Sequence, residues 1–146
     1  MTNHQPVMSV ADLDAFFDAE FPQMRQAGAM TLVSVGAGSA TMRLPYHPAN
    51  LRPGGTISGP AMFALADVGL YAVILAHIGP VGLAVTTNLN INFLNKPKPQ
   101  ALLAECTLLK LGKRLAIGDA RVFGEDDNIL VAHATGTYSI PPVSKV

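Results

Sequence analysis

Residues 59–78 read GPAMFALADVGLYAVILAHI, a run in which Asp67 is the single carboxylate and no Lys or Arg occurs. The run predicts one long helix, because a Gly-Pro pair suits a helix start and the following Gly79-Pro80 suits a helix end. A helix that is apolar nearly all round either spans a membrane or lies buried in a protein core. Asp67 at its middle would cost about 2.5–3.5 kcal/mol in a bilayer. We therefore expect a core helix and no membrane partner.

The segments on both sides of this helix have the residue patterns of β-strands. Before the helix, a Gly-containing turn joins two predicted strands as a hairpin, and a loop rich in Pro and Gly follows. After the helix, four predicted strands are separated by turns. The six predicted strands span residues 29–36, 39–45, 83–95, 101–111, 114–123 and 129–140. This order predicts an α+β fold in which an antiparallel sheet curls around one long central apolar helix.

A second helix is predicted at the N-terminus, over residues 9–26. Ser9 can cap its start and Gly28 supplies a stop. The length of 146 residues suits a single domain. Within it, we expect residues 1–28 to form a helical extension and residues 29–146 to form the main domain.

The composition excludes several classes of protein. Hydrophobic residues make up 49% of the chain and charged residues 14%, which excludes disorder. The formal net charge is zero, which argues against a nucleic-acid partner. Cys106 has no second cysteine, and His47, His77 and His133 lack metal-ligand spacing, so we expect neither a disulfide nor a metal. The N-terminal residues lack the pattern of a signal peptide, and we expect a cytoplasmic location.

Asp67 is the strongest candidate for a functional residue. A carboxylate buried in an apolar helix costs several kcal/mol unless it is paired or hydrogen-bonded. No Lys or Arg lies within a turn or two of it. Either the fold exposes Asp67 at a helix edge or at a subunit seam, or its environment suits general-base or nucleophilic work. We favour the functional interpretation.

The Gly-rich segment before the helix is the second candidate. Unpaired N–H groups at a helix N-terminus suit an anion or a developing oxyanion, and the N–H of Gly59 is the obvious donor because Pro60 has none. An ordinary loop and helix cap would have the same composition. Gly59 and Asp67 are about 12 Å apart along a helix, too far for one carbonyl to touch both. If both act, we expect them to come from two subunits of a symmetric dimer.

Two further sets of residues have weaker signals. Strand alternation would put Thr86 and Asn88 on one face, where a hydroxyl could orient a water, although β-propensity alone also explains them. Cations cluster at predicted turns and strand ends, either as solvated turn residues or as groups that attract phosphates. These cations are Lys96, Lys98, Lys113 and Arg114.

Two stretches together resemble a known family. Residues 52–67 read RPGGTISGPAMFALAD and residues 85–94 read VTTNLNINFL. They resemble the corresponding regions of hotdog-fold acyl-CoA thioesterases of the phenylacetate-degradation (PaaI-like) type, whose members usually read G-x-x-H-G-G-x-x-x-x-L-A-D. The resemblance covers roughly residues 29–140. It implies a hotdog fold, and the N-terminal helix looks like a variable extension.

The resemblance also implies a mechanism. The thioester carbonyl would lie against the Gly59 N–H, and Asp67 of a partner subunit would activate water or attack directly. Thr86 would help to hold the water. Ser58 stands where the family has His, and it can still donate a hydrogen bond. The catalytic residues implied are therefore Asp67, Gly59, Thr86 and Ser58.

Substrate contacts follow from the same resemblance. Arg52 or Asn50 takes the place of a polar family residue upstream of the helix, and Pro60 replaces the second Gly of the motif. Lys113 and Arg114 would lie near the CoA phosphates. The full set of substrate-contacting residues implied is Asn50, Arg52, Gly55, Pro60, Met62, Phe63, Leu70, Tyr71, Asn88, Lys113 and Arg114.

The expected function is hydrolysis of an acyl-CoA thioester by a homo-oligomer, with a dimer as the minimum and a tetramer favoured. No cofactor is expected, since CoA is part of the substrate. Hotdog hydratases need a His five residues after the carboxylate, where Ala72 stands, so that chemistry is disfavoured. A non-catalytic acyl-CoA-binding or sensor protein remains the alternative, because one fold hosts several functions.

Overall fold

A computed structural model describes residues 4–25 and 29–142 of the chain. The helices are α1 (Val10–Glu20), the 3₁₀ helix η1 (Pro22–Arg25), the 3₁₀ helix η2 (Pro48–Asn50) and α2 (Gly59–Ile78). The strands are β1 (Thr31–Gly36), β2 (Ser39–Leu44), β3 (Val85–Phe93), β4 (Leu102–Leu111), β5 (Leu115–Gly124) and β6 (Leu130–Ser139). The six expected strands and the long helix are all present, with bounds close to those predicted.

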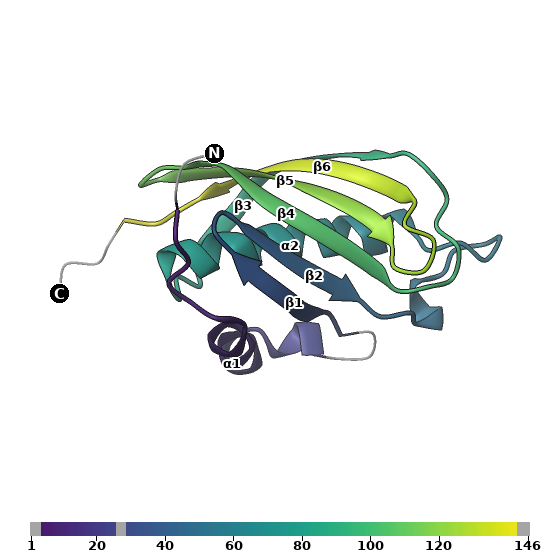
Figure 1. Cartoon of the computed structure of the whole chain (residues 1–146), viewed down its shortest axis with the longest axis horizontal. Coiled ribbons are helices and arrows are strands. Elements are labelled where there is room, and N and C mark those ends of the chain that lie inside the picture. Colours follow the sequence, from purple (N-terminus) through teal and green to yellow (C-terminus); the bar gives the residue numbers. More distant parts are fainter. Residues whose placement is uncertain (1–3, 26–28, 143–146) are drawn as a thin grey trace.

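The strands form one antiparallel sheet in the order β1-β2-β4-β5-β6-β3. Figure 1 shows the sheet curving over α2, with α1 beside β1 at the opposite edge from β3. The expected α+β architecture, an antiparallel sheet around one central helix, is confirmed. Because the sheet covers α2 on several sides, the helix can be apolar nearly all round without facing water.

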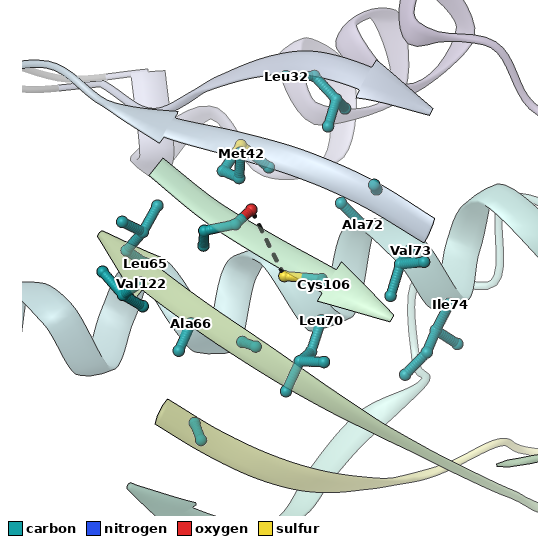
Figure 2. Packing of buried hydrophobic residues seen from close by; sticks show 14 of the residues in the cluster. Leu32, Met42, Leu65, Ala66, Leu70, Ala72, Val73, Ile74, Cys106 and Val122 are labelled. Atoms are coloured by element: carbon teal, nitrogen blue, oxygen red, sulfur yellow. Dashed lines mark hydrogen bonds between the residues drawn. The ribbon is translucent and has the colours of Figure 1, made fainter. Parts of the chain in front are cut away.

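The burial of α2 fits a core helix. It is long and apolar enough to cross a membrane by length and composition, with a mean hydropathy of 1.9, but 67% of that span is buried inside the protein. Side chains of α2 and of the strands fill the space between helix and sheet (Figure 2). Burial of this apolar surface drives the packing of helix against sheet.

Leu70 shows how closely α2 approaches the sheet. Its side chain is fully buried, and a Cβ built on Gly118 or Gly136 would lie 2.9 or 2.7 Å from its methyl groups. These two strand glycines therefore make room for Leu70, whose side chain Figure 2 shows among the residues packed between α2 and the sheet. The structure places Leu70, an expected substrate-contacting residue, in the core, and its side chain lines none of the pockets described below.

The N-terminal helix is shorter than expected. Its capping by Ser9 is confirmed, because the Ser9 hydroxyl accepts from the Asp12 N–H at 3.1 Å. The helix ends at Glu20, before Pro22, whose ring and missing N–H do not allow an α-helix to continue. A short 3₁₀ helix replaces the expected last turns, and Gly28, the expected stop, lies outside the described residues.

β3 is the edge strand that contacts Asp67. It pairs with β6 on one side, and its other side has no strand partner in the described part of the chain. Apolar side chains are exposed along it: Val85 and Phe93 are 50% and 51% exposed. Exposed apolar edge strands are ready to pair with another chain.

Candidate active site at Asp67

Asp67 is held by two hydroxyl groups from different strands. The Thr86 hydroxyl on β3 donates to Asp67 Oδ1 at 2.7 Å, and the Tyr138 hydroxyl on β6 lies 2.6 Å from the same oxygen. Tyr138 also lies 2.7 Å from the backbone carbonyl oxygen of Asp67. The carboxylate is half-buried, and Oδ2 makes no hydrogen bond to the described residues. One oxygen is therefore anchored and the other is available to a ligand or a water.

Tyr138 is the site residue that sequence reasoning missed. Its side chain is 2% exposed, and it pairs with Thr86 across the β3–β6 ladder. Burial raises the pKa of Tyr138 well above its ordinary value, and the nearby charge and hydrogen bond of Asp67 raise it further. The phenol therefore stays protonated and can donate at any physiological pH. The sequence contained one signal that could have found it. Tyr138 is an aromatic residue with a hydroxyl group, on the inward face of a strand whose other inward residues are mostly small.

A pocket of about 680 Å³ opens in front of Asp67. Its walls come from the end of α1, from α2, from the loop after α2 and from the start of β3, and none of the lining residues is Lys, Arg or His. Aromatic and aliphatic groups dominate the lining, with Glu20 as the other acidic residue. The lining residues are Phe16, Glu20, Phe21, Asp67, Val68, Tyr71, Pro80, Gly82, Leu83, Ala84, Val85, Thr86 and Tyr138.

The aromatic wall of this pocket joins α1 to α2. The Tyr71 ring stacks on Tyr138 with centroids 6.2 Å apart, and the rings of Phe16 and Phe21 lie 6.5 and 6.3 Å from Tyr71. The Tyr71 hydroxyl donates to the Gly82 carbonyl at 3.0 Å, so it does not reach Asp67. The expected substrate residue Tyr71 thus lies in the Asp67 pocket, and α1 contributes to that pocket.

A β-bulge separates two residues that were expected to share a face. The β3–β6 register shifts between Thr86 and Asn88, so Thr86 pairs with Tyr138 and Asn88 with the next residue back, Thr137. Strict alternation is broken, and the prediction of a shared face is wrong. The Thr86 hydroxyl reaches Asp67, whereas Asn88 pairs with Thr137 and lines none of the pockets described here.

The N-terminus of α2 forms a second pocket, of about 390 Å³. Ser58 is the N-cap, and its hydroxyl oxygen accepts from the Ala61 N–H at 3.2 Å. Pro60 has no N–H, and the Gly59 N–H has no partner among the described residues. Gly59 lines this pocket, so an unused donor lies at the pocket wall. The lining residues are Arg52, Thr56, Ile57, Gly59, Met62, Phe93, Leu94, Asn95, Lys96 and Pro97.

The loop before α2 is pinned by its own backbone. The Ser58 N–H donates to the Asn50 carbonyl at 2.8 Å, and the Arg52 N–H donates to the Thr56 carbonyl at 2.9 Å. Gly55 has a φ of +81°, a conformation that glycine adopts without strain. Of these expected substrate residues, Arg52 lines the Gly59 pocket, whereas Asn50 and Gly55 support the loop next to it.

The remaining expected residues fall in separate places. Met62 lines the Gly59 pocket, and Phe63 is exposed on α2 outside the pockets described here. Lys113 and Arg114 line a third cavity of about 770 Å³ beyond the other end of α2, together with Pro80, which also borders the Asp67 pocket. Within the described ranges, no three His, Cys, Asp or Glu side chains are grouped as a metal site would need.

Sequence comparison identifies the group of proteins to which these features belong. The sequence model of the family described as "Thioesterase superfamily" matches residues 54–131. This range includes α2, the helix that contributes to both the Asp67 pocket and the Gly59 pocket. A candidate esterase of Saccharolobus solfataricus is 26% identical over 136 residues, covering 92% of this chain and 87% of that protein.

Comparison with solved structures agrees. A candidate thioesterase from Silicibacter sp. TM1040 is 45% identical, superposes with a TM-score of 0.87 and covers 97% of each chain. The phenylacetic acid degradation protein PaaI of Thermus thermophilus is 24% identical, with a TM-score of 0.69, covering 82% of this chain and 99% of that one. At that identity, the likeness to PaaI shows a shared fold alone.

Proposed function

Because the chain belongs to the thioesterase superfamily and has its hotdog fold, we propose that it hydrolyses acyl-CoA thioesters to a free acid and CoA. The observation that carries this proposal is the Asp67 carboxylate, anchored through Oδ1 at the wall of a largely apolar pocket. A carboxylate with one fixed and one available oxygen suits a general base or a nucleophile. Among the described residues, no cation lines the pocket to neutralise the carboxylate.

The proposed reaction uses Asp67 and Gly59 in complementary roles. Asp67 Oδ2 takes a proton from a water as the water oxygen bonds to the thioester carbonyl carbon. The carbonyl oxygen becomes an oxyanion, which the Gly59 N–H and the positive end of α2 stabilise. When the C–S bond breaks, the CoA sulfur takes the proton back from Asp67. The Thr86 hydroxyl donates a hydrogen bond to Asp67 Oδ1. Its oxygen still has lone pairs that can accept a hydrogen bond from this water.

The two groups need two subunits to meet. β3 runs from Val85 at the Asp67 pocket to Phe93 at the Gly59 pocket. If two copies pair antiparallel along their β3 edges about a twofold axis, the start of one β3 lies beside the end of the other. That pairing joins the Asp67 pocket of one copy to the Gly59 pocket of the second. We therefore propose a homo-oligomer of at least a dimer, with two composite sites, and favour a tetramer.

Two basic regions could contact the CoA phosphates in this proposal. Lys113 and Arg114 line the cavity next to the Asp67 pocket, and the Nε of Arg114 already donates to the Ile140 carbonyl at 3.2 Å. Arg52 and Lys96 line the Gly59 pocket, where the thioester carbonyl would bind. We retain Lys113 and Arg114 as the proposed phosphate contacts, with Arg52 and Lys96 as further cations along the path of the substrate.

The test is release of free CoA from a panel of acyl-CoAs by the wild type and by Asp67→Asn. Asn keeps the shape and an acceptor oxygen for Thr86 and Tyr138, but it cannot take a proton. We expect hydrolysis by the wild type and a drop of about 10²–10⁴-fold in kcat in the variant. Asp119→Asn is the matched control, because this carboxylate pairs with His133 on the sheet, away from the pockets.

Two outcomes would contradict the proposal. If the wild type binds acyl-CoA to saturation without releasing CoA, the chain is a binding or sensor protein. If Asp67→Asn and Asp119→Asn both retain the wild-type rate, hydrolysis does not depend on the Asp67 carboxylate.

A further inference from the structure

We propose that Tyr138 is a positioning residue that fixes the Asp67 carboxylate for catalysis through its hydroxyl group. This inference rests on the proposed function and adds a residue to it. The hydroxyl oxygen lies 2.6 Å from Asp67 Oδ1 and 2.7 Å from the Asp67 backbone carbonyl oxygen. It therefore spans the side chain and the main chain of one residue, which restrains the side-chain torsions of Asp67 directly.

The proton count at this contact explains why the restraint suits a base. A tyrosine hydroxyl has one proton, and here it has two acceptors within reach, the carboxylate and the carbonyl. While Asp67 is charged, donation to Oδ1 is the stronger hydrogen bond. When Oδ2 takes up a proton, Oδ1 becomes a weaker acceptor, and the hydroxyl can donate to the carbonyl instead. Tyr138 is thus satisfied in both protonation states of Asp67.

The surroundings of Asp67 make these hydroxyl donors important. In the part of the chain that the structure describes, no Lys, Arg or His lines the pocket, and the other titratable groups there are Glu20, at the end of α1, and Tyr71, on α2. Glu20 has the same sign as Asp67, and the Tyr71 hydroxyl is bonded to Gly82. Among the described residues, Thr86 and Tyr138 are therefore the side-chain donors that hold the Asp67 carboxylate in place.

The ring and the hydroxyl of Tyr138 have separable roles. The ring is buried and stacks on Tyr71 at an interplanar angle of 19°. Phenylalanine would keep that packing and remove only the hydroxyl. Tyr71→Phe is the matched control, because it removes a hydroxyl from the same stacked pair and the same pocket without touching Asp67.

The experiment compares kcat and KM for the wild type, Tyr138→Phe and Tyr71→Phe, with melting temperatures to show that each is folded. For Tyr138→Phe we expect kcat to fall about 10- to 100-fold, as for loss of a hydrogen bond to a charged group, with KM within about twofold. Tyr71→Phe leaves both hydroxyl contacts to Asp67 in place, so its kcat should fall less. Wild-type kcat in Tyr138→Phe would overturn the proposal, as would an equal fall in kcat in both variants.

A second readout needs no turnover and separates this inference from the proposed function. The ¹³C chemical shift of the Asp67 side-chain carboxyl carbon is compared by NMR at pH 7 in the same three proteins. A changed chemical shift in Tyr138→Phe alone supports the positioning role even if no thioester is hydrolysed. Identical chemical shifts in the wild type and Tyr138→Phe would overturn the role even if hydrolysis is established.

Discussion

Asp67 and Gly59 lie eight positions apart on α2, and each lines a different pocket. The Asp67 carboxylate is held by hydroxyls at the start of β3 and the end of β6, whereas Gly59 is the first residue of α2 and lies close to the Phe93 ring. Neither pocket alone contains both a base and an oxyanion donor. A hydrolase built from these two parts is therefore incomplete as a single chain.

The proposed dimer seam along β3 can be tested with charge. Asn88 and Asn90 are exposed on the outward face of β3 and line neither pocket. In Asn88→Asp/Asn90→Asp, like charges face one another across an antiparallel β3–β3 seam and should weaken the dimer and the activity together. Light scattering at several protein concentrations measures the weakening of the dimer. Added salt should restore association because it screens the repulsion between the introduced charges.

The neutral double variant Asn88→Ser/Asn90→Ser is the control for that experiment. It removes the same amides without adding charge, and it should remain a dimer. Unchanged association of the Asp variant in low salt would show that β3 is not the seam.

The aromatic wall contributed by α1 should set which acyl groups fit. Phe16 and Phe21 border the Asp67 pocket and are only partly buried, so truncation enlarges the pocket with limited loss of core. We expect Phe21→Ala to raise kcat/KM for bulkier acyl-CoAs about 10-fold relative to the best wild-type substrate. Phe123→Ala, on β5 and outside the three pockets, is the control. An acyl preference that is unchanged in Phe21→Ala would place the acyl group elsewhere.

Acid stability should depend on Asp127 in the β5–β6 turn. The Ile129 N–H, followed by the Gln100 side chain, donates to this carboxylate and lowers its pKa below the ordinary 3.8. A lowered pKa in the folded state stabilises the protein above that ordinary value, and the contribution disappears as the pH falls through the lowered pKa. Urea unfolding at pH 7 should therefore give a higher free energy of unfolding for the wild type than for Asp127→Asn. This difference in the free energy of unfolding should disappear at about pH 2.

Asp126→Asn serves as the neighbouring control for the acid-stability measurement, because the Asp126 side chain makes no hydrogen bond to the described residues. A difference between the wild type and Asp127→Asn that stayed constant from pH 7 to strong acid would contradict the assignment.

Much of the fold was predictable because its signals are local. Apolar composition and the Gly-Pro pairs mark α2, and turn residues mark the strand ends. Asp67 was predictable because it interrupts an apolar helix, and the inward contact of Thr86 with it agrees with its expected place beside the site. The end of α1 was also predictable, because proline does not allow an α-helix to continue. The helix predicted over residues 9–26 ran past Pro22, whereas α1 ends at Glu20, before that proline.

The features that escaped prediction depend on long-range pairing. Tyr138 reaches Asp67 only because β6 lies next to β3 in the sheet, and the two residues are 71 positions apart. The bulge that turns Asn88 outward follows from the register of the same two strands. Leu70 was assigned to a pocket because an apolar helix shows no preferred face in its sequence. Only the small strand residues above it reveal that it belongs to the core.

The most direct test of the composite site is subunit complementation. Asp67→Asn removes the base, and Gly59→Val blocks the donor pocket, since a Cβ at position 59 lies 3.3 Å from the far end of the exposed Phe93 ring. The two variants are co-expressed with different tags, and the mixed dimer is purified. One of its two sites then combines an intact Asp67 with an intact Gly59, so the mixed dimer should recover about half of the wild-type CoA-release rate. A mixed dimer no more active than either variant alone would contradict a site shared between subunits.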